Sequence, residues 1–390
     1  MRLITNSYLH RVISGQARGP AAAILRGVLR CGEFCYSSAV RTRNVFYDCR
    51  ILPSHQLPVP VISIGNITAG GTGKTPMARY LATGLAQRGM HPAILMRGYH
   101  RSASGISDEQ ALLADQLQEL KIPVHANPDR VAGGRQILQN HPQTDVILLD
   151  DGFQHRRLAR DIDIVLIDAT NPFGFGHVHP RGLLREPATG LRRAAALILT
   201  RCEQLNANQS DEITQPVRRY NPNIPIFRSR FIHTGLRFAS TSISAPAGIS
   251  LETLKSHRVF ATAAIANPGP FQFSLKNLTA LDLPHLWFPD HHDYTATDLA
   301  EIRSRAAESG ATAIITTEKD WVKLRSLPAA SDGSPPIWRL DLDIQFEASD
   351  EQQLWPLLTS RLRRPQQDRP PQPHNPGEDQ NRQNHPNSRP

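Results

Sequence analysis

One stretch of sequence decides the fold class of this chain: Ile64-Gly65-Asn66-Ile67-Thr68-Ala69-Gly70-Gly71-Thr72-Gly73-Lys74-Thr75. An apolar, strand-like run at Val59–Ile64 precedes it, and a helical pattern at Met77–Gln87 follows it. A glycine-rich segment between a strand and a helix is the setting of a phosphate-binding loop, because its backbone can curl until successive N–H groups face phosphate oxygens. The sequence therefore predicts a P-loop that binds a nucleotide along Thr68–Thr75.

Two side chains of this loop have predicted roles. Lys74 is expected to bridge the β- and γ-phosphates of ATP, and the Thr75 hydroxyl is expected to bind Mg²⁺. The usual pattern begins with glycine where this chain has Thr68, so the match departs at one position. The alternative is a glycine-rich turn without a ligand, which the strand–loop–helix context disfavours.

A second apolar run, Val146–Leu149, ends in the tandem aspartates Asp150 and Asp151. An aspartate at the end of a strand beside a phosphate loop is the second half of a Mg²⁺ site. The two carboxylates point to opposite sides if the strand continues, so we predict that only one of them is a direct ligand. The alternative is that they cap the turn that follows.

Apolar runs and helical patterns alternate along the first half of the chain. The runs are nearly continuous, as in strands buried on both faces of a parallel sheet. They lie at Val59–Ile64, Ala93–Met96, Val146–Leu149, Ile162–Ile167 and Ala195–Leu199, with helical patterns at Met77–Gln87 and Asp108–Leu120. We therefore predict an α/β fold with a P-loop NTPase-like, doubly wound, mostly parallel sheet.

The pattern changes after about Asn206. A strand-like run at Ile224–Phe231 leads into a second α/β series with strands near Val259–Ala264 and Ala313–Thr316 and a helix near Thr297–Glu308. From about Arg363 the chain has no apolar residues, so we expect disorder there. The predicted segments are a basic amphipathic N-terminus (1–50), a P-loop domain (51–225), a smaller α/β domain (226–362) and a disordered tail (363–390).

Positive charge is concentrated at the N-terminus. The chain carries a net charge of +9, and residues 1–50 contain eight arginines against Glu33 and Asp48. Apolar residues recur at helical spacing within Pro20–Val40, a stretch that is too short and too charged to span a bilayer. Two interpretations remain open: an interfacial helix on an anionic membrane surface, and an amphipathic helix packed on its own domain.

Other features bear on the cellular location. No signal-peptide cleavage pattern follows a clean apolar run. The four cysteines form no CxxC pair, which favours a reduced, cytosolic chain without a zinc ribbon.

Several further motifs point to one family. With the phosphate loop, they resemble the tetraacyldisaccharide 4′-kinase family over roughly residues 20 to 325, in the same order. They are RGY at 97–99, DDGFQHRRLxRD at 150–161, LREP at 184–187, ANP at 266–268, FPDHHxY at 288–294 and TTEKDxVKL at 316–324. The resemblance implies an ATP-dependent kinase that phosphorylates the 4′-hydroxyl of tetraacyldisaccharide 1-phosphate, a lipid A disaccharide precursor, to form lipid IVA in lipid A biosynthesis.

The resemblance also implies a location and residue roles. The N-terminal helix would rest, as a peripheral or monotopic element, on the cytoplasmic face of the bacterial inner membrane. By motif position, Asp108 is the expected general base and His291 its partner, while Asp150 and Glu186 join Thr75 at Mg²⁺. Three arginines are available for the 1-phosphate of the substrate: Arg97, Arg101 and Arg185.

The residues alone leave alternatives. Asp108 could be a helix N-cap, and the pairs His291–His292 and His177-x-His179 could be metal ligands. A P-loop ATPase that drives assembly or transport would not need Asp108 or the Asp290-His291 block. A nucleic-acid-binding ATPase would interleave basic and aromatic residues near the site. In this chain aromatic residues make up only 6%, and the excess positive charge lies at the N-terminus. We therefore predict no nucleic-acid partner.

The chain departs from the family pattern at a few positions. Ser107 and His100 replace glycines, and Pro180-Arg181-Gly182-Leu183 precedes Leu184-Arg185-Glu186-Pro187 in an unusual form. None of these changes removes a reactive group. We expect them to affect local loop shape and the choice of acyl chains.

Overall fold

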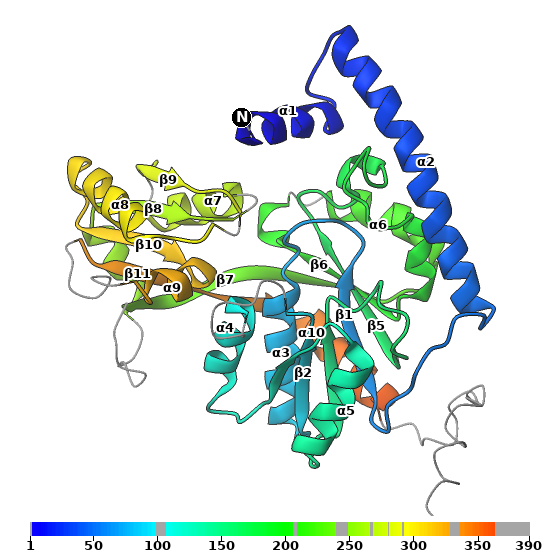
Figure 1. Ribbon diagram of the computed structural model, residues 1–390. Helices are drawn as coiled ribbons and strands as arrows, with labels where there is room; N and C mark the ends of the chain where they lie inside the picture. Colours follow the sequence, from blue (N-terminus) through cyan, green and yellow to red (C-terminus); the bar gives the residue numbers. More distant parts are fainter. Residues whose placement is uncertain are drawn as a thin grey trace, which may run out of the picture.

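The computed structural model describes residues 2–98, 107–205, 209–238, 249–265, 268–279, 281–290, 292–327 and 335–362. The strands of these residues form one 11-stranded sheet in the order β3-β2-β4-β1-β5-β6-β7-β11-β10-β8-β9 (Figure 1). Their bounds are β1 Val61–Asn66, β2 Pro92–Met96, β3 Val124–Ala126, β4 Val146–Asp150, β5 Ile162–Asp168, β6 Ala196–Thr200, β7 Ile226–Phe238, β8 Val259–Ala263, β9 His285–Trp287, β10 Ala313–Thr317 and β11 Ile337–Phe346. Of the pairs within this sheet only β7–β11 is antiparallel, so the predicted mostly parallel α/β sheet is confirmed.

The strands of the first half are apolar on both faces because both faces are covered. Ile62 and Leu148 face a core that contains residues of helix α3, while Val61 and Ile147 face a second core on the opposite side. The helices of this half are α3 Lys74–Gln87, α4 Asp108–Leu117, α5 Arg130–Asn140 and α6 Gln209–Tyr220. This burial explains the continuous apolar runs in the sequence.

Strand β7 belongs to both halves of the molecule. Its first residues, Ile226 to Arg228, pair with β6 in parallel, and residues 229–238 pair with β11 in antiparallel register. Figure 1 shows β7 as the long strand that joins the two groups of helices. The predicted domain boundary at 225/226 therefore falls where this shared strand begins, and the division into two domains stays a prediction.

The second half packs three helices on β8–β11: α7 Gly269–Thr279, α8 Ala296–Glu308 and α9 Glu318–Leu324. The last helix, α10 (Ala348–Leu362), lies elsewhere. Its Leu354, Trp355 and Leu358 are buried in the same core as Ile62 of β1 and Leu81 of α3. The final element of the predicted second domain thus completes the core of the first half.

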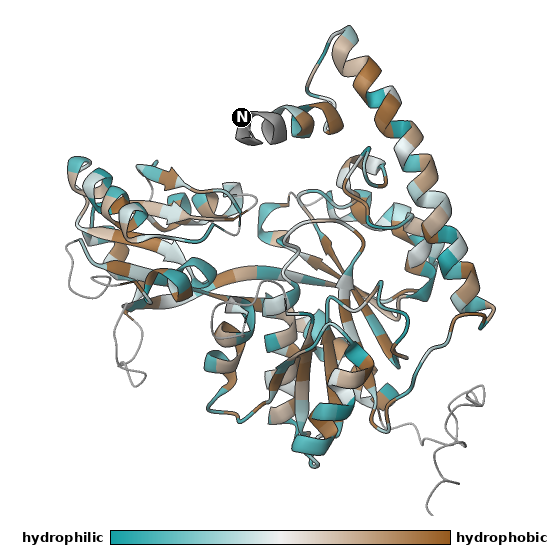
Figure 2. Ribbon diagram, in the orientation of Figure 1, coloured by the Kyte–Doolittle hydropathy of each residue, from teal (hydrophilic) through white to brown (hydrophobic). Residues whose placement is uncertain are grey.

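Two helices precede the sheet, α1 (Arg2–Ile13) and α2 (Pro20–Asp48). The 29-residue helix α2 runs along one side of the molecule, projects beyond it at its N-terminal end and carries apolar residues along its length (Figures 1 and 2). Ile24, Val28 and Phe34 are 69%, 63% and 74% exposed. Among the helices of the described residues, none combines the length and apolarity needed to cross a bilayer.

Candidate active site

Two glycines give the predicted phosphate loop its shape between the end of β1 at Asn66 and the start of α3 at Lys74. Gly70 has φ 128° and Gly73 has φ 86°, values that favour glycine. A Cβ at Gly73 would also lie 2.4 Å from Cζ of Phe231 on β7. Glycine is therefore required here for both conformation and space.

Side chains at the carboxyl ends of β1 and β6 form hydrogen bonds with the loop. The Asn66 amide donates to Thr72 Oγ1 at 3.0 Å, and Thr200 Oγ1 donates to the Thr72 carbonyl at 3.1 Å. Arg201 donates to the Gly71 carbonyl at 2.7 Å. These bonds fix the loop backbone before any ligand binds.

The LREP segment pairs with the other side of the loop. The Ala69 N–H donates to the Leu183 carbonyl at 2.6 Å, and the Arg185 N–H donates to the Ile67 carbonyl at 2.7 Å. Two motifs that are far apart in the sequence thus form one backbone unit.

Thr75 and Asp150 lie together, as the sequence predicted for a Mg²⁺ site. Thr75 Oγ1 donates to Asp150 Oδ2 at 3.3 Å. Asp150 is only 5% exposed, and its Oδ1 finds no hydrogen-bond partner among the described residues. Burial raises the pKa of Asp150 to about 6, against the opposing charge of Lys74.

These residues fit a magnesium ion. A hydroxyl and a buried carboxylate with one unbonded oxygen are the hard oxygen donors that Mg²⁺ prefers. Across the described ranges no three His, Cys, Asp or Glu side chains form a metal-binding group, so phosphate and water oxygens would have to complete the coordination.

Asp151 has a different environment because the chain turns sharply after β4. Its φ is 53°, and its carboxylate accepts two hydrogen bonds from Arg185, at 2.5 and 3.2 Å. Lys74 Nζ lies 3.6 Å from the same carboxylate. Burial acts to raise the pKa of Asp151, but Lys74 and Arg185 hold it below its usual value. The geometry therefore favours Asp150 as the metal ligand of the pair.

Arg185 and Glu186 are both engaged by protein groups. Arg185 also donates to Asn66 Oδ1 at 3.1 Å. Glu186 is fully buried, and its Oε1 accepts from Gln154 Nε2 at 2.9 Å while its Oε2 accepts from Arg193 Nη2 at 2.9 Å. The substrate-phosphate role of Arg185 and the metal-ligand role of Glu186 stay predictions.

Asp108 is the first residue of α4, but the helix cap is Ser107, whose Oγ accepts from Gln110 N at 3.3 Å. The alternative of Asp108 as N-cap is therefore wrong. The charge of Glu109 contributes to the raised pKa of Asp150, so the first turn of α4 lies within electrostatic reach of the Thr75–Asp150 pair. The side chain of Asp108 lies outside the described part of the structure.

The other predicted residues are only partly placed. Arg97 directly follows β2, at the carboxyl edge of the sheet where the phosphate loop lies. Arg101 and His291 lie outside the described residues, as does the tail 363–390.

Histidines that resembled metal ligands have protein partners. His177 Nδ1 lies 3.1 Å from Glu33 Oε2, and the rings of His179 and Tyr36 contact each other at 6.0 Å, so both histidines contact α2. His292 Nε2 lies 3.1 Å from Asp298 at the cap of α8. These contacts give His177, His179 and His292 packing partners within the protein, whereas His291 lies outside the described residues.

Sequence reasoning missed Thr200, Arg201 and Gln154. Thr200 and Arg201 reach the loop because β6 ends at the same edge of the sheet as β1, and Arg201 also pairs with Asp168 at the end of β5. Neither residue belongs to a recognisable motif. Attention to every strand end at the carboxyl edge would have found them.

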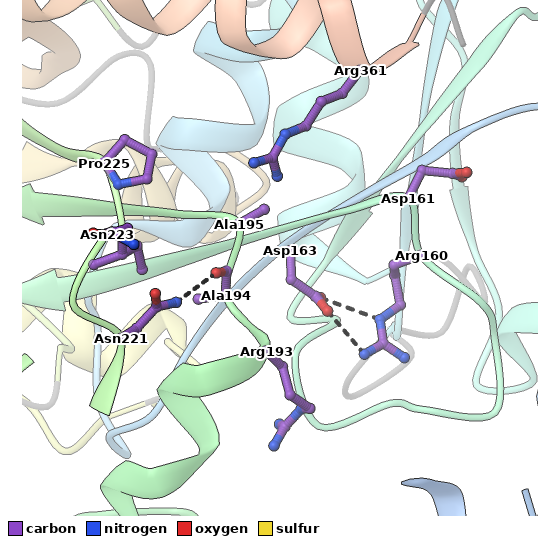
Figure 3. A pocket seen from close by; sticks show the side chains of 11 residues that line it. Arg160, Asp161, Asp163, Arg193, Ala194, Ala195, Asn221, Asn223, Pro225 and Arg361 are labelled. Atoms are coloured by element: carbon purple, nitrogen blue, oxygen red, sulfur yellow. Dashed lines mark hydrogen bonds and ion pairs between the residues drawn. The ribbon is translucent and has the colours of Figure 1, made fainter. Parts of the chain in front are cut away.

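A pocket of about 330 Å³ lies at the opposite edge of the sheet. Figure 3 shows its lining, which comes from the segments that precede β5, β6 and β7, together with Asp163 at the start of β5 and Arg361 of α10. Ligands of parallel α/β sheets bind outside the carboxyl ends of the strands, where the phosphate loop lies. This pocket is therefore not the nucleotide site.

The model of the family described as tetraacyldisaccharide-1-P 4′-kinase matches residues 25–363. The chain belongs to this family. It is 39% identical to the tetraacyldisaccharide 4′-kinase of Syntrophus aciditrophicus over 74% of this chain and 82% of that protein. It is 37% identical to the enzyme of Anaeromyxobacter dehalogenans strain 2CP-C over 84% of this chain and 89% of the relative.

A solved structure has the same fold. The LpxK of Aquifex aeolicus, determined in complex with ATP, is 29% identical with a TM-score of 0.66, covering 87% of this chain and 99% of that one. The predicted family, fold and lipid A 4′-kinase function are thus confirmed. This chain is a kinase of the tetraacyldisaccharide 4′-kinase family.

Proposed function

We propose that this kinase transfers the γ-phosphoryl group of Mg-ATP to the 4′-hydroxyl of tetraacyldisaccharide 1-phosphate at the Lys74–Thr75–Asp150 site. The observation that carries the assignment is the buried, unbonded Oδ1 of Asp150 beside the Thr75 hydroxyl at the start of α3. The ATP in the solved relative supports the same donor. Mg²⁺, held by Thr75 and Asp150, would neutralise charge on the β- and γ-phosphates.

Residues of the phosphate loop and its surroundings would hold ATP, the phosphoryl donor. The phosphate loop presents backbone N–H groups, and the Lys74 ammonium carries the positive charge that the transferring group requires. Asp151 holds Lys74 and Arg185 on one carboxylate, which fixes both cations before the nucleotide binds. Glu186 as a further magnesium ligand belongs to this proposal on the strength of its motif position.

The acceptor side rests on Asp108. In the proposed step the 4′-oxygen attacks the γ-phosphorus, the hydroxyl proton passes to the Asp108 carboxylate, and ADP leaves. His291 would orient that carboxylate, and Arg97, Arg101 and Arg185 would hold the 1-phosphate. Asp108 is assigned this role by its motif position, at the start of α4.

An activity assay tests the assignment of the site. Purified protein, detergent-dispersed disaccharide 1-phosphate and labelled ATP should yield a bisphosphorylated lipid. Lys74→Ala should lower the rate by about 10²–10⁴, as the loss of a charge-stabilising group does. A decrease of less than about tenfold would show that the phosphoryl group is transferred elsewhere.

We also propose that α2 rests on the cytoplasmic face of the bacterial inner membrane. Its exposed Ile24, Val28 and Phe34, together with the N-terminal arginines, suit an anionic lipid surface. The opposite face of the helix docks on the protein through Glu33, whose Oε1 accepts from the Val178 N–H at 2.8 Å. The two interpretations of this helix are therefore compatible.

Vesicle binding tests this location. Replacing Ile24, Val28 and Phe34 together by serine should lower sedimentation with phosphatidylglycerol vesicles, because each exposed apolar side chain contributes roughly 1–2 kcal/mol when buried in lipid. Ser38→Ala, on an exposed position of the same helix, is the control. Equal sedimentation of the triple variant and the control would contradict membrane docking through α2.

A further inference from the structure

The docked face of α2 is bonded to the two segments that flank the phosphate loop. Tyr36 Oη donates to the Arg185 carbonyl at 3.1 Å, and Asn44 Nδ2 donates to Glu186 Oε2 at 3.4 Å. Arg43 donates to the Gln154 carbonyl at 3.4 Å. Helix α2 thus contacts both the LREP segment and the loop that follows β4.

Asn44 is itself held in place. Its carbonyl accepts from Arg156 Nη1 at 2.9 Å, and the same guanidinium forms an ion pair with Asp48 at 2.7 Å, one turn further along α2. The C-terminal part of α2 is therefore held to the protein at several points.

The contacts continue from these segments to the phosphate loop. Gln154 Nε2 donates both to Glu186 Oε1, at 2.9 Å, and to the Asn66 carbonyl, at 2.7 Å. Asn66 in turn donates to Thr72 Oγ1. A continuous chain of hydrogen bonds therefore runs from Asn44 through Glu186, Gln154 and Asn66 into the loop.

Burial makes this chain of hydrogen bonds sensitive to its first residue, Asn44. Glu186 is fully buried, and its carboxylate accepts hydrogen bonds from Gln154, Arg193 and Asn44. The space is also tight, since a Cβ on Gly190 would lie 2.3 Å from Glu186 Oε2. A change at Asn44 cannot be absorbed by a free movement of the Glu186 carboxylate.

We propose that α2 is a positioning element of the nucleotide site, with Asn44 as its positioning residue. The helix that meets the lipid surface also sets, through Glu186 and Gln154, where β1 ends and the phosphate loop begins. This inference rests on the proposed nucleotide site. It predicts that a defect at Asn44 weakens ATP binding, in addition to any role of α2 toward lipid.

The test compares two substitutions that add the same charge to the same helix. Asn44→Asp places a second carboxylate against Glu186, whereas Thr42→Asp adds one at an exposed position. The full-length variants are assayed in nonionic detergent for the Kd of ATP, the KM of ATP and the KM of lipid. Asn44→Asp should raise the Kd and KM of ATP by roughly tenfold with the KM of lipid within twofold, and Thr42→Asp should leave all three unchanged.

Two substitutions milder than Asn44→Asp keep the proposal testable if that variant fails to fold. Asn44→Ala and Tyr36→Phe each remove a single hydrogen bond and should raise the Kd of ATP by roughly twofold to fivefold at unchanged vesicle binding. Equal ATP affinities for Asn44→Asp and Thr42→Asp would overturn the proposal. A parallel rise in the KM of ATP and lipid would also overturn it, since that outcome indicates general distortion.

The Lys74→Ala variant separates this inference from the proposed function. If Lys74→Ala retains ATP affinity and activity, the nucleotide site itself is misassigned. A different result is that Lys74→Ala loses ATP affinity and activity while Asn44→Asp binds ATP as tightly as Thr42→Asp does. That result would support the nucleotide site and refute the positioning role of α2.

Discussion

Asp150 and Asp151 carry the same carboxylate but have different partners. Asp150 ends β4 and meets Thr75, while the backbone of Asp151 turns to φ 53° and directs its carboxylate to Lys74 and Arg185. The sequence predicted that only one of the two would be a direct metal ligand. It left the choice open because the turn after the strand depends on tertiary packing, including the close approach of Phe153 to Gly65.

His155, four residues further on, is a half-buried base among arginines. Its Nε2 has no hydrogen-bond partner within the part of the chain that the structure describes. Burial, followed by the charges of Arg130 and Arg160, lowers the pKa of His155 to about 4, and Asp129 opposes this only in part. The folded protein therefore keeps His155 neutral at pH values where an unfolded chain would protonate it.

The first prediction is a pH-dependent stability that originates at His155. Below the unfolded pKa of about 6.5 the unfolded state binds the proton more readily, so the free energy of unfolding falls as pH decreases from about 6.5 to 4. Because His155 is partly exposed, we expect the free energy of unfolding to fall by about 2 kcal/mol over this range. His155→Gln should remove this component in urea unfolding between pH 7 and 4.5. Identical pH slopes for the two proteins would contradict the assignment.

At the scale of elements, the apolar pattern located most strands of the first half and the helices α3 and α4, but it missed α5 and α6 and the polar ends of the elements that it found. The predicted helix Met77–Gln87 begins at Lys74 in the structure, because its first turn carries loop residues without an apolar pattern. Likewise, β7 continues from Ile226 to Phe238, past the predicted end at Phe231, through alternating polar residues. Helix α10 contains Pro356 and went unpredicted, since tertiary packing of Trp355 and Leu358 overrides the cost of an internal proline.

The second prediction concerns the contact between α3 and α10. A Cβ at Gly84 of α3 would lie 2.1 Å from the Trp355 ring, and Arg88 stacks on the same ring at 3.8 Å. Glycine to alanine inside a helix normally stabilises by up to about 1 kcal/mol, but here overpacking should dominate and destabilise by about 1–3 kcal/mol. Urea unfolding measures the difference.

A double variant identifies the cause. Gly84→Ala combined with Trp355→Leu should be less destabilised than the sum of the single changes, because the smaller side chain leaves room for the methyl group. Strict additivity, or a Gly84→Ala protein more stable than the parent, would refute the packing argument.

At the scale of the whole molecule, the sheet is continuous and its cores draw on distant segments. Residues of β7, β11 and α10, namely Phe227, Ile344, Phe346, Leu354, Trp355, Leu358 and Leu362, are buried in the core around α3. The candidate site shows the same dependence on distant partners, since Asn44 and Glu186 are 142 positions apart. Motifs can predict which residues bear chemistry, as for the phosphate loop, but contacts between segments this far apart leave no local pattern in the sequence.

The third prediction follows from this shared core. A fragment that ends at residue 225, the predicted domain boundary, should lack a cooperative urea transition, because its core loses the apolar residues of β7, β11 and α10. A chain ending at residue 362 should unfold cooperatively like the full protein. Circular dichroism during urea titration distinguishes the two cases, and a cooperative transition of the 1–225 fragment would contradict the prediction.

The position of α10 also matters while the ribosome is making the protein. The residues of α3 that line this core leave the exit tunnel long before Leu354, Trp355 and Leu358 of α10, which cover them. At typical translation speeds this delay is on the order of tens of seconds. During that time the apolar side of the nascent nucleotide-binding half is uncovered, so cellular chaperones have a defined surface to shield until α10 has left the tunnel.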